Sequence, residues 1–165
     1  MHVDDLIITS TDQNMIDELC RRLKERYGEI RRHDGPVLNF LGMAFDLSHC
    51  DEMRMHMKGY TMDTIQYAGV PSRARTPATS GLFDTREGAR LVLEPVRVWF
   101  HSIVAKLSYL PKRAKLECLK AVAYLATRVT RCTGDDVEKF RRVLKYMSDT
   151  VWSCRVYRAY GTYQT

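Results

Sequence analysis

The sequence predicts an α+β fold, in which a few strands with one long helix precede a helical region. Apolar residues alternate with smaller or polar ones between positions 37 and 57, which is the period of a β-strand. Between 11 and 27, and again from 95 to 148, they recur every three or four positions, as in a helix. With 165 residues, 45% hydrophobic and 28% charged, the chain has globular composition and about the length of one domain.

A short strand and an amphipathic helix are the first elements expected. An apolar run at residues 6–8 follows two acids at a tight turn and has the composition of a strand. From Thr11 to about Tyr27 the spacing is helical, with Ser10 or Thr11 as the expected N-cap and Gly28 as the stop. The apolar face of this helix consists of Met15, Ile16, Leu19, Leu23 and Tyr27.

A β-hairpin is expected next. Residues 37–47 form its first strand, residues 48–52 supply the turn, and methionines of the second strand alternate with Arg54 and His56. These methionines are Met53, Met55 and Met57. We interpret them as the buried face of that strand rather than as a metal or thioether site, because methionine readily fills apolar cores. A short helix over residues 60–68 follows.

A long loop separates this half from three further helices. Residues 69–88 contain two prolines and show little periodicity, so we place a domain boundary near residue 80. The predicted parts are residues 1–80, residues 81–150 and a tail of residues 151–165. Helices are predicted over 95–110, 113–130 and 135–148. In the first of these, the residues expected to face the core are Val96, Trp99, Phe100, Ile103, Leu107 and Leu110.

The last of these helices is signalled at its start. Thr133 stands three residues before Asp136, which is the spacing of a capping box. Its apolar stripe consists of Val137, Phe140, Leu144 and Met147. The opposite, basic face consists of Lys139, Arg141, Arg142 and Lys145.

Positive charge is concentrated in the C-terminal half. The formal net charge is +6; residues 83–165 hold 16 Lys and Arg against 8 Asp and Glu, whereas residues 1–82 hold 10 against 12. A solvated helical surface accounts for the excess. So does polyanion binding, in which lysines and arginines neutralise phosphates and release counterions. On charge alone both interpretations stay open.

Several classes of protein are disfavoured by the sequence. Five cysteines form neither a CxxC pair nor a zinc-type spacing with histidine, and their odd number argues against a disulfide framework, so we expect reduced thiols. No glycine-rich strand-to-helix turn suggests a nucleotide cofactor. The longest apolar runs are far shorter than the ~20 residues of a membrane span, and no signal peptide is recognisable. We therefore expect a cytoplasmic or nuclear protein without a membrane partner.

The pair Asp4-Asp5 is, by itself, typical of a solvated turn or a helix cap. The motifs that surround the pair indicate a more specific role. HVDDLIITS precedes an amphipathic helix that ends in RYGEI. LNFLGMAFDLS follows, and then a helical region that contains VAKLSYL and YLATRV. In this order the motifs resemble the reverse transcriptase of copia-type LTR retrotransposons, over most of the chain.

The resemblance implies a polymerase metal site. In that family a Tyr-Val-Asp-Asp turn joins two palm strands, so Asp4 would ligate metal directly with Asp5 beside it, and His2 stands where the family has tyrosine. Phosphoryl transfer of this kind uses two divalent ions ~4 Å apart, and Mg²⁺ prefers carboxylate oxygens. A further aspartate and the fingers are expected to lie before Met1, so we expect the isolated chain not to polymerise.

The resemblance also assigns nucleic-acid contacts. The hairpin resembles the primer grip, which makes Phe40, Leu41, Gly42 and Met43 candidate contacts to the primer; Gly42 suits a close backbone approach. Alternatively, the three larger residues are hairpin core and Gly42 is a bulge. The helices after residue 94 resemble the thumb and connection region. Candidate phosphate contacts there are Lys139, Arg141, Arg142 and Lys145.

The overall hypothesis is a fragment of an RNA-directed DNA polymerase, with a partial palm followed by a thumb-like helical region. Its intact parent would bind template–primer duplex, deoxynucleoside triphosphates, two Mg²⁺ ions and the remaining polyprotein domains. The long helix is expected to pack on the palm strands, with an exposed strand edge at residues 1–9. Residues 112–116 depart from the family's Arg-Pro-Asp-like segment, which together with His2 suggests a drifting copy. The alternatives are a non-catalytic nucleic-acid-binding remnant and a small helical interaction domain.

Overall fold

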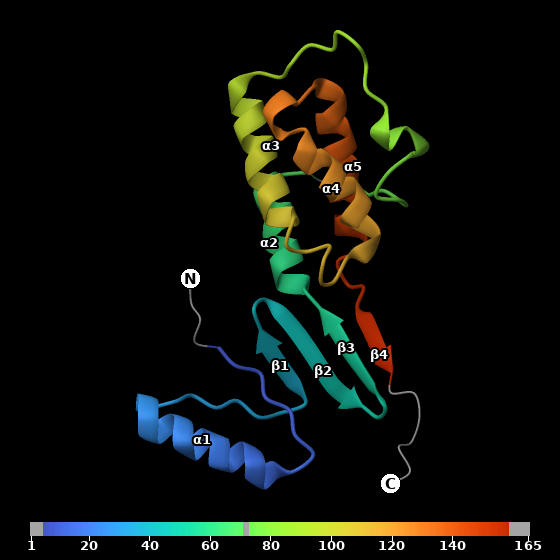
Figure 1. Ribbon diagram of the computed structural model, residues 1–165. Coiled ribbons are helices and arrows are strands. Elements are labelled where there is room, and N and C mark those ends of the chain that lie inside the picture. The colour runs from blue at the N-terminus through green and yellow to red at the C-terminus, as the bar shows by residue number, and fades with distance from the viewer. Residues whose placement is uncertain (1–4, 71–72, 159–165) are drawn as a thin grey trace. The chain divides into compact units, whose positions relative to one another are not determined.

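The structure, a computed structural model, describes residues 5–70 and 73–158 (Figure 1). Within these residues the chain is a mixture of five α-helices and a four-stranded antiparallel sheet, so the predicted α+β class is confirmed. The chain divides into two compact units, one of residues 1–55 with 156–165 and the other of residues 56–155. The division falls at residue 55, whereas the sequence pattern placed a boundary near residue 80.

The sheet begins with a tight hairpin. Strand β1 (Val37–Phe40) pairs antiparallel with β2 (Met43–His49), with Phe40 opposite Met43. Leu41 and Gly42 form the two-residue turn and have φ values of 49° and 75°, as a type I′ turn requires. The prediction of one continuous strand over 37–47 is therefore wrong. The alternation of larger apolar residues with smaller or polar ones changes phase at Gly42. This glycine lies in the turn rather than in a bulge.

Two further strands complete the sheet in the order β1-β2-β3-β4. Strand β3 (Glu52–His56) follows β2 through a turn at residues 50–51, and Met55, at 5% exposure, is buried as the methionine stripe predicted. Strand β4 (Arg155–Arg158) comes from the predicted tail. In the first unit the Arg158 guanidinium lies 3.3 Å from the Glu52 carboxylate, which ties β4 to β3.

Helix α1 (Gln13–Tyr27) forms where the periodicity predicted it, but its surroundings differ. Asp12 is the N-cap, and its carboxylate accepts the Asn14 N–H at 2.9 Å, so the prediction of Ser10 or Thr11 is wrong. Gly28 ends the helix at φ 86°, as expected. No residue of α1 is buried, and its apolar face is therefore not packed on the strands in the way the sequence suggested.

Residues 6–8 do not form the predicted strand. They lie in irregular backbone, and Leu6 is 67% exposed. A strand needs a neighbour to accept and donate its backbone hydrogen bonds, and no described residue pairs with this segment. The expected strand edge at 1–9 is thus absent from the described residues 5–9.

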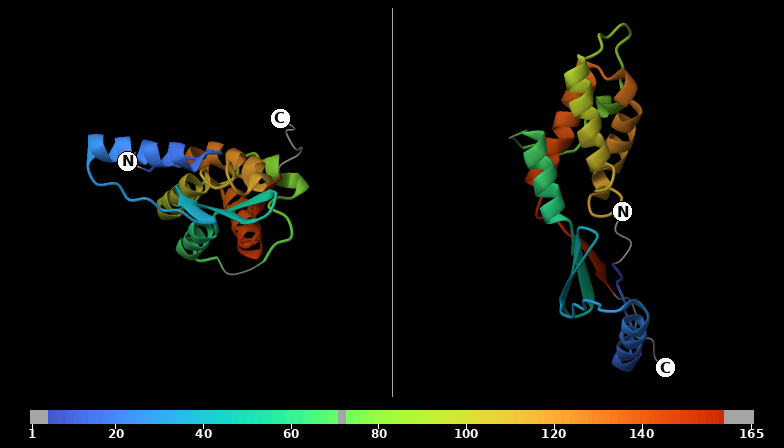
Figure 2. Two further views of the ribbon diagram at one scale, coloured as in Figure 1. Left: turned by 90° about the horizontal axis from the view of Figure 1, so that it is seen from below. Right: turned by 90° about the vertical axis from the view of Figure 1, so that its left-hand side faces the viewer.

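The second unit is a helical cluster (Figure 1 and Figure 2). Its helices are α2 (Lys58–Ala68), α3 (Glu94–Leu107), α4 (Leu119–Thr127) and α5 (Gly134–Asp149). Phe100 of α3 and Phe140 of α5 meet at the centre, both 0% exposed, with ring centroids 5.0 Å apart. Other fully buried core residues are Ile103, Leu107, Leu110, Leu125, Val143, Leu144 and Met147.

Helix ends in this unit follow local chemistry. The capping box of Thr133 and Asp136 at the start of α5 is present, as predicted. The helix predicted over 113–130 is shorter, because Lys115 leaves the helical region of the backbone at φ −127° and ψ 57°. A short 3₁₀ turn (Leu116–Cys118) follows it before α4 begins.

The described residues contain no helix long and apolar enough to cross a membrane. All five cysteines are free thiols. Burial raises the pKa of the Cys118 thiol to about 12 and that of Cys132 to about 11, so both stay protonated and act as small apolar core groups.

Candidate nucleic-acid interface

Helix α5 carries the four basic residues predicted to contact phosphates, and the structure divides them into two pairs. Lys139 and Arg142 contact residues 73–88, which we call the strap. Arg141 and Lys145 lie one helical turn apart and line a hollow beside α3. The four residues therefore do not form one continuous basic face.

The first pair is already engaged within the chain. The ammonium of Lys139 donates to the Asp84 carbonyl and lies 5.5 Å from the centre of the Tyr124 ring. Arg142 donates from Nη2 to the hydroxyl of Thr76 at 2.9 Å. A polyanion would have to displace these contacts, so this pair serves first to hold the strap.

The strap is also fastened at its two ends. Arg73 pairs with Asp149 at 3.5 Å, and Arg86 pairs with Asp135 at 3.4 Å. Both arginines are more than 80% exposed, and exposed ion pairs of this kind contribute roughly 0–1 kcal/mol each. Leu82, at 6% exposure, contributes more, because burying a leucine side chain is worth about 1.5–3 kcal/mol.

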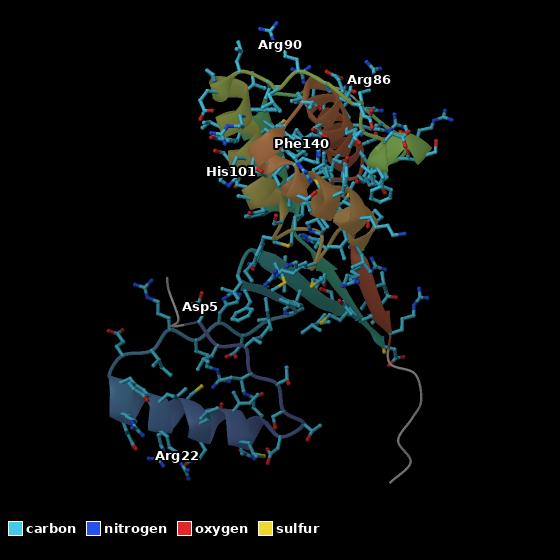
Figure 3. All side chains as sticks on the ribbon, turned by 45° about the horizontal axis from the view of Figure 1, so that its top comes forward. Asp5, Arg22, Arg86, Arg90, His101 and Phe140 are labelled. Carbon is cyan, nitrogen blue, oxygen red and sulfur yellow. The ribbon has the colours of Figure 1, made fainter. Side chains whose placement is uncertain are left out.

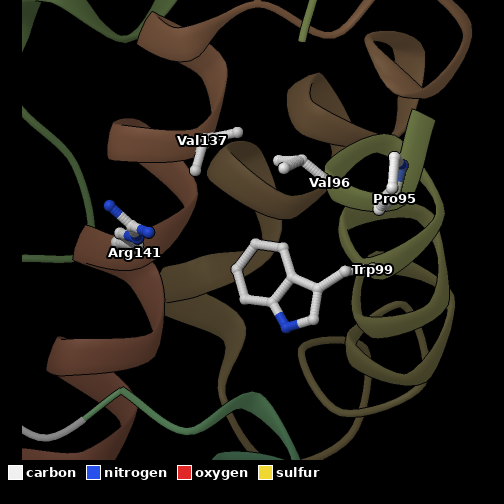
Figure 4. A pocket seen from close by; sticks show the side chains of 5 residues that line it. All are labelled: Pro95, Val96, Trp99, Val137 and Arg141. Atoms are coloured by element: carbon white, nitrogen blue, oxygen red, sulfur yellow. The ribbon is translucent and has the colours of Figure 1, made fainter. Parts of the chain in front are cut away.

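A pocket of about 240 Å³ lies between α3 and α5 (Figure 4). Trp99 forms one wall, and Arg141 stands opposite it on α5. The other lining residues are Pro95, Val96 and Val137. Val96 was expected to face the core, but it is 37% exposed and lines this pocket instead.

A second, more polar hollow of about 480 Å³ shares Trp99 and Arg141 with the first. Its lining consists of Ala68, Gly69, Val70, Trp99, Glu138, Arg141 and Lys145. Glu138 accepts a hydrogen bond from Arg141 at 2.7 Å, with the two side chains 67% and 49% exposed. Such an exposed pair is weak, so a phosphate could exchange with the carboxylate at little cost.

This arrangement suits one kind of ligand chemistry. The Trp99 ring is held edge-on to Phe140, with centroids 5.8 Å apart, so its position is fixed by the core. An indole held beside two cations offers a stacking surface for a base and charge for the adjoining phosphate. The sequence identified the cations but assigned Trp99 only to the core, because periodicity gives the face of a helix and not the size of the space opposite.

The hairpin places its four candidate primer contacts together. Phe40 and Met43 are half-buried partners across the strands, whereas Leu41, 49% exposed, and Gly42 form the exposed tip. Phe40 and Met43 therefore pack within the sheet, whereas Leu41 and Gly42 are accessible to a ligand.

The predicted metal site lies mostly outside the described residues. His2 and Asp4 belong to the part of the chain that the structure does not describe. Asp5 is exposed on the irregular segment before α1 (Figure 3). Among the residues described, no group of three or more His, Cys, Asp or Glu side chains is placed to hold a metal ion.

Comparison with known proteins gave no match: no protein-family model matches the sequence, and neither a curated protein nor a solved structure resembles it significantly.

Proposed function

We propose that this chain is a segment of a copia-type RNA-directed DNA polymerase, and that its helical unit binds the template–primer duplex. The order of motifs supports the assignment: an Asp-Asp pair, an amphipathic helix, a hairpin and a cluster of helices. The hairpin tip at Leu41 and Gly42 is a surface that could approach a primer backbone closely, since Gly42 has no side chain.

The observation that carries the binding proposal is the pair Arg141 and Lys145 beside the Trp99 indole. Each cation that neutralises a phosphate releases counterions and so adds affinity independent of sequence. Stacking of an unpaired template base on an aromatic ring contributes about 1–3 kcal/mol. Together they favour a junction between duplex and single-stranded template over a uniform duplex.

In the intact polymerase, Asp4 and Asp5 would supply carboxylates for the Mg²⁺ pair that activates the primer hydroxyl and holds the incoming deoxynucleoside triphosphate. That role depends on the resemblance of HVDDLIITS alone. Binding and catalysis are therefore separate parts of the proposal, and different variants test them.

The binding test uses fluorescence anisotropy with a DNA primer–template that has a single-stranded overhang. We expect the R141A/K145A variant to bind about 10- to 100-fold more weakly than the parent, with the slope of log affinity against log salt reduced by about 2. The matched control, K120A/R131A, removes two exposed cations of the same unit outside the pocket. Equal losses in both variants would show a diffuse charge effect and contradict the assigned site.

A non-catalytic nucleic-acid-binding protein is the second candidate. It is favoured by the irregular backbone at 6–8, where the family's hairpin has a strand beside the two acids. In this case D4N/D5N would bind the primer–template as tightly as the parent, and neither protein would extend the primer with Mg²⁺ and deoxynucleoside triphosphates. Primer extension by the parent that D4N/D5N abolishes would exclude this candidate. No salt-dependent binding by either protein would instead favour a helical interaction domain.

A further inference from the structure

Thr76 lies on the strap with its hydroxyl against an arginine of α5. It is exposed, and its Oγ1 accepts a hydrogen bond from Nη2 of Arg142 at 2.9 Å. The local sequence is Arg73-Ala-Arg-Thr76-Pro77, so the threonine follows two arginines and precedes a proline. Proline disfavours helical backbone at the residue before it, and the chain bends at residues 75–77, so Thr76 lies in an exposed, non-helical segment that a protein kinase can reach.

The guanidinium of Arg142 has a hydrogen-bonding group left over. Its Nε is buried and has no hydrogen-bond partner. Among the described residues, the only other buried side-chain nitrogen or oxygen without a partner is the hydroxyl oxygen of Tyr124. Nε and Nη2 lie on the same edge of the planar guanidinium, and this edge fits two oxygens of one carboxylate or phosphate. The Thr76 hydroxyl supplies only one oxygen to it.

A buried donor without a partner is destabilising, so the contact between Arg142 and Thr76 leaves one donor of the guanidinium unsatisfied. A phosphate on the Thr76 oxygen would bring three further oxygens to the same edge. Arg73, three residues earlier on the strap, and Arg75, the residue before Thr76, add positive charge nearby. The site therefore has a modifiable hydroxyl, a fixed cationic receptor and an unused donor.

We propose that Thr76 is a phosphorylation site and that Arg142 is the receptor for its phosphate. A proline-directed serine/threonine kinase would transfer the γ-phosphoryl group of ATP to Oγ1 of Thr76. The new O–P bond forms as the bond to the β-phosphate oxygen breaks, ADP leaves, and the hydroxyl proton passes to the kinase's base. The phosphate then bonds to both donors of the Arg142 edge and fastens the strap to α5.

Thr79 provides an internal control for site selection. It is an exposed threonine of the same strap, but proline does not follow it and no hydrogen bond joins it to an arginine. Modification governed only by exposure would reach both threonines, whereas the proposed recognition selects Thr76. Neither comparison involves nucleic acid, so the outcome is independent of the proposed function.

The experiment treats the full chain with a proline-directed kinase and ATP and locates the phosphate by mass spectrometry. We expect one phosphate at Thr76, absent from T76A and retained in T79A. ³¹P NMR titration then gives the second pKa of the phosphate, which is ordinarily about 6. In the folded chain it should lie at least about half a unit lower than in a phosphorylated peptide of residues 70–82, because the Arg142 edge favours the dianion.

The variant R142Q keeps a hydrogen-bonding side chain of similar length but removes the cation. In phosphorylated R142Q the pKa should return to that of the peptide. If R142Q does not fold, the comparison of parent with peptide still decides the matter. Modification elsewhere than Thr76, or a phosphate pKa equal to that of the peptide in the parent chain, overturns the proposal and leaves the Thr76–Arg142 bond as a fastener of the strap.

Discussion

The ammonium of Lys115 is buried and donates a hydrogen bond to the backbone carbonyl of Thr150. The Ser153 hydroxyl accepts a second one. Lys115 is 2% exposed, and no carboxylate of the described residues lies within ion-pair distance of its nitrogen. A buried cation held only by neutral oxygens ties the segment after α5 to the start of α4, at the cost of desolvation.

This burial predicts a dependence of stability on pH. Desolvation lowers the pKa of Lys115, and the nearby Glu117 opposes the shift only in part. Between the lowered pKa and the ordinary value of about 10.4 the unfolded chain binds more protons than the folded one, so stability from this group rises with pH. Below the lowered pKa both states are protonated and the contribution is constant.

The variant K115M isolates this effect. Urea unfolding should be measured from pH 7 to 10.5. The unfolding free energy of the parent, minus that of K115M, should increase as the pH rises from the lowered pKa of Lys115 toward its ordinary value. The thiol of Cys118 is present in both chains, so its own titration largely cancels from the difference. A difference that stays flat over the whole range would show that Lys115 is not desolvated in solution.

Removing the negative charge of Asp136 should lower the stability of the helical unit strongly. It is 1% exposed, accepts from the backbone and the hydroxyl of Thr133, and lies 3.2 Å from the Arg128 guanidinium. D136N would leave the guanidinium of Arg128, whose side chain is only 12% exposed, without its charged partner, and breaking a buried ion pair in this way costs about 3–5 kcal/mol. The neighbouring D135N, which breaks only an exposed pair with Arg86, should cost less than about 1 kcal/mol. Chemical denaturation of both variants tests the contrast.

The chain has two tryptophans, Trp99 and Trp152, and base stacking on Trp99 should be visible in its fluorescence. The other, Trp152, is 73% exposed and stacks with the Lys58 ammonium at 3.4 Å from its ring centre, away from the α3–α5 pockets. If a template base stacks on Trp99, an oligonucleotide should quench the emission of W152F, in which only Trp99 remains, and leave W99F unchanged. Quenching confined to W99F would place the bound nucleic acid at Trp152 instead.

Sequence reasoning located most elements because periodicity is a property of a single segment. The range of α1, the capping box at Thr133 and the buried Met55 follow from local pattern alone. The strand expected at 6–8 failed because pairing depends on a partner that a local pattern does not contain. The contacts that Lys139 and Arg142 make with the strap could not be predicted for the same reason, since their partners lie 55 and 66 residues away in the sequence.

The turn at Leu41 and Gly42 was missed because its chemistry is unusual. A type I′ turn has φ > 0 at both central positions, which favours Asn-Gly, whereas a leucine at φ 49° is strained. Only Gly42 was available as a signal, and an isolated glycine also marks a bulge. The leucine at this position therefore costs stability.

A pair of substitutions at this turn tests that interpretation. L41N should raise the unfolding free energy of the hairpin-containing unit by about 0.5–1 kcal/mol, because asparagine tolerates the left-handed region that leucine disfavours. G42A should lower it by about 1 kcal/mol, since any side chain is strained at φ 75°. Thermal and urea unfolding measure both changes. If L41N is more stable yet binds primer–template more weakly than the parent, Leu41 contacts the primer; if it is less stable, the turn does not have this geometry in solution.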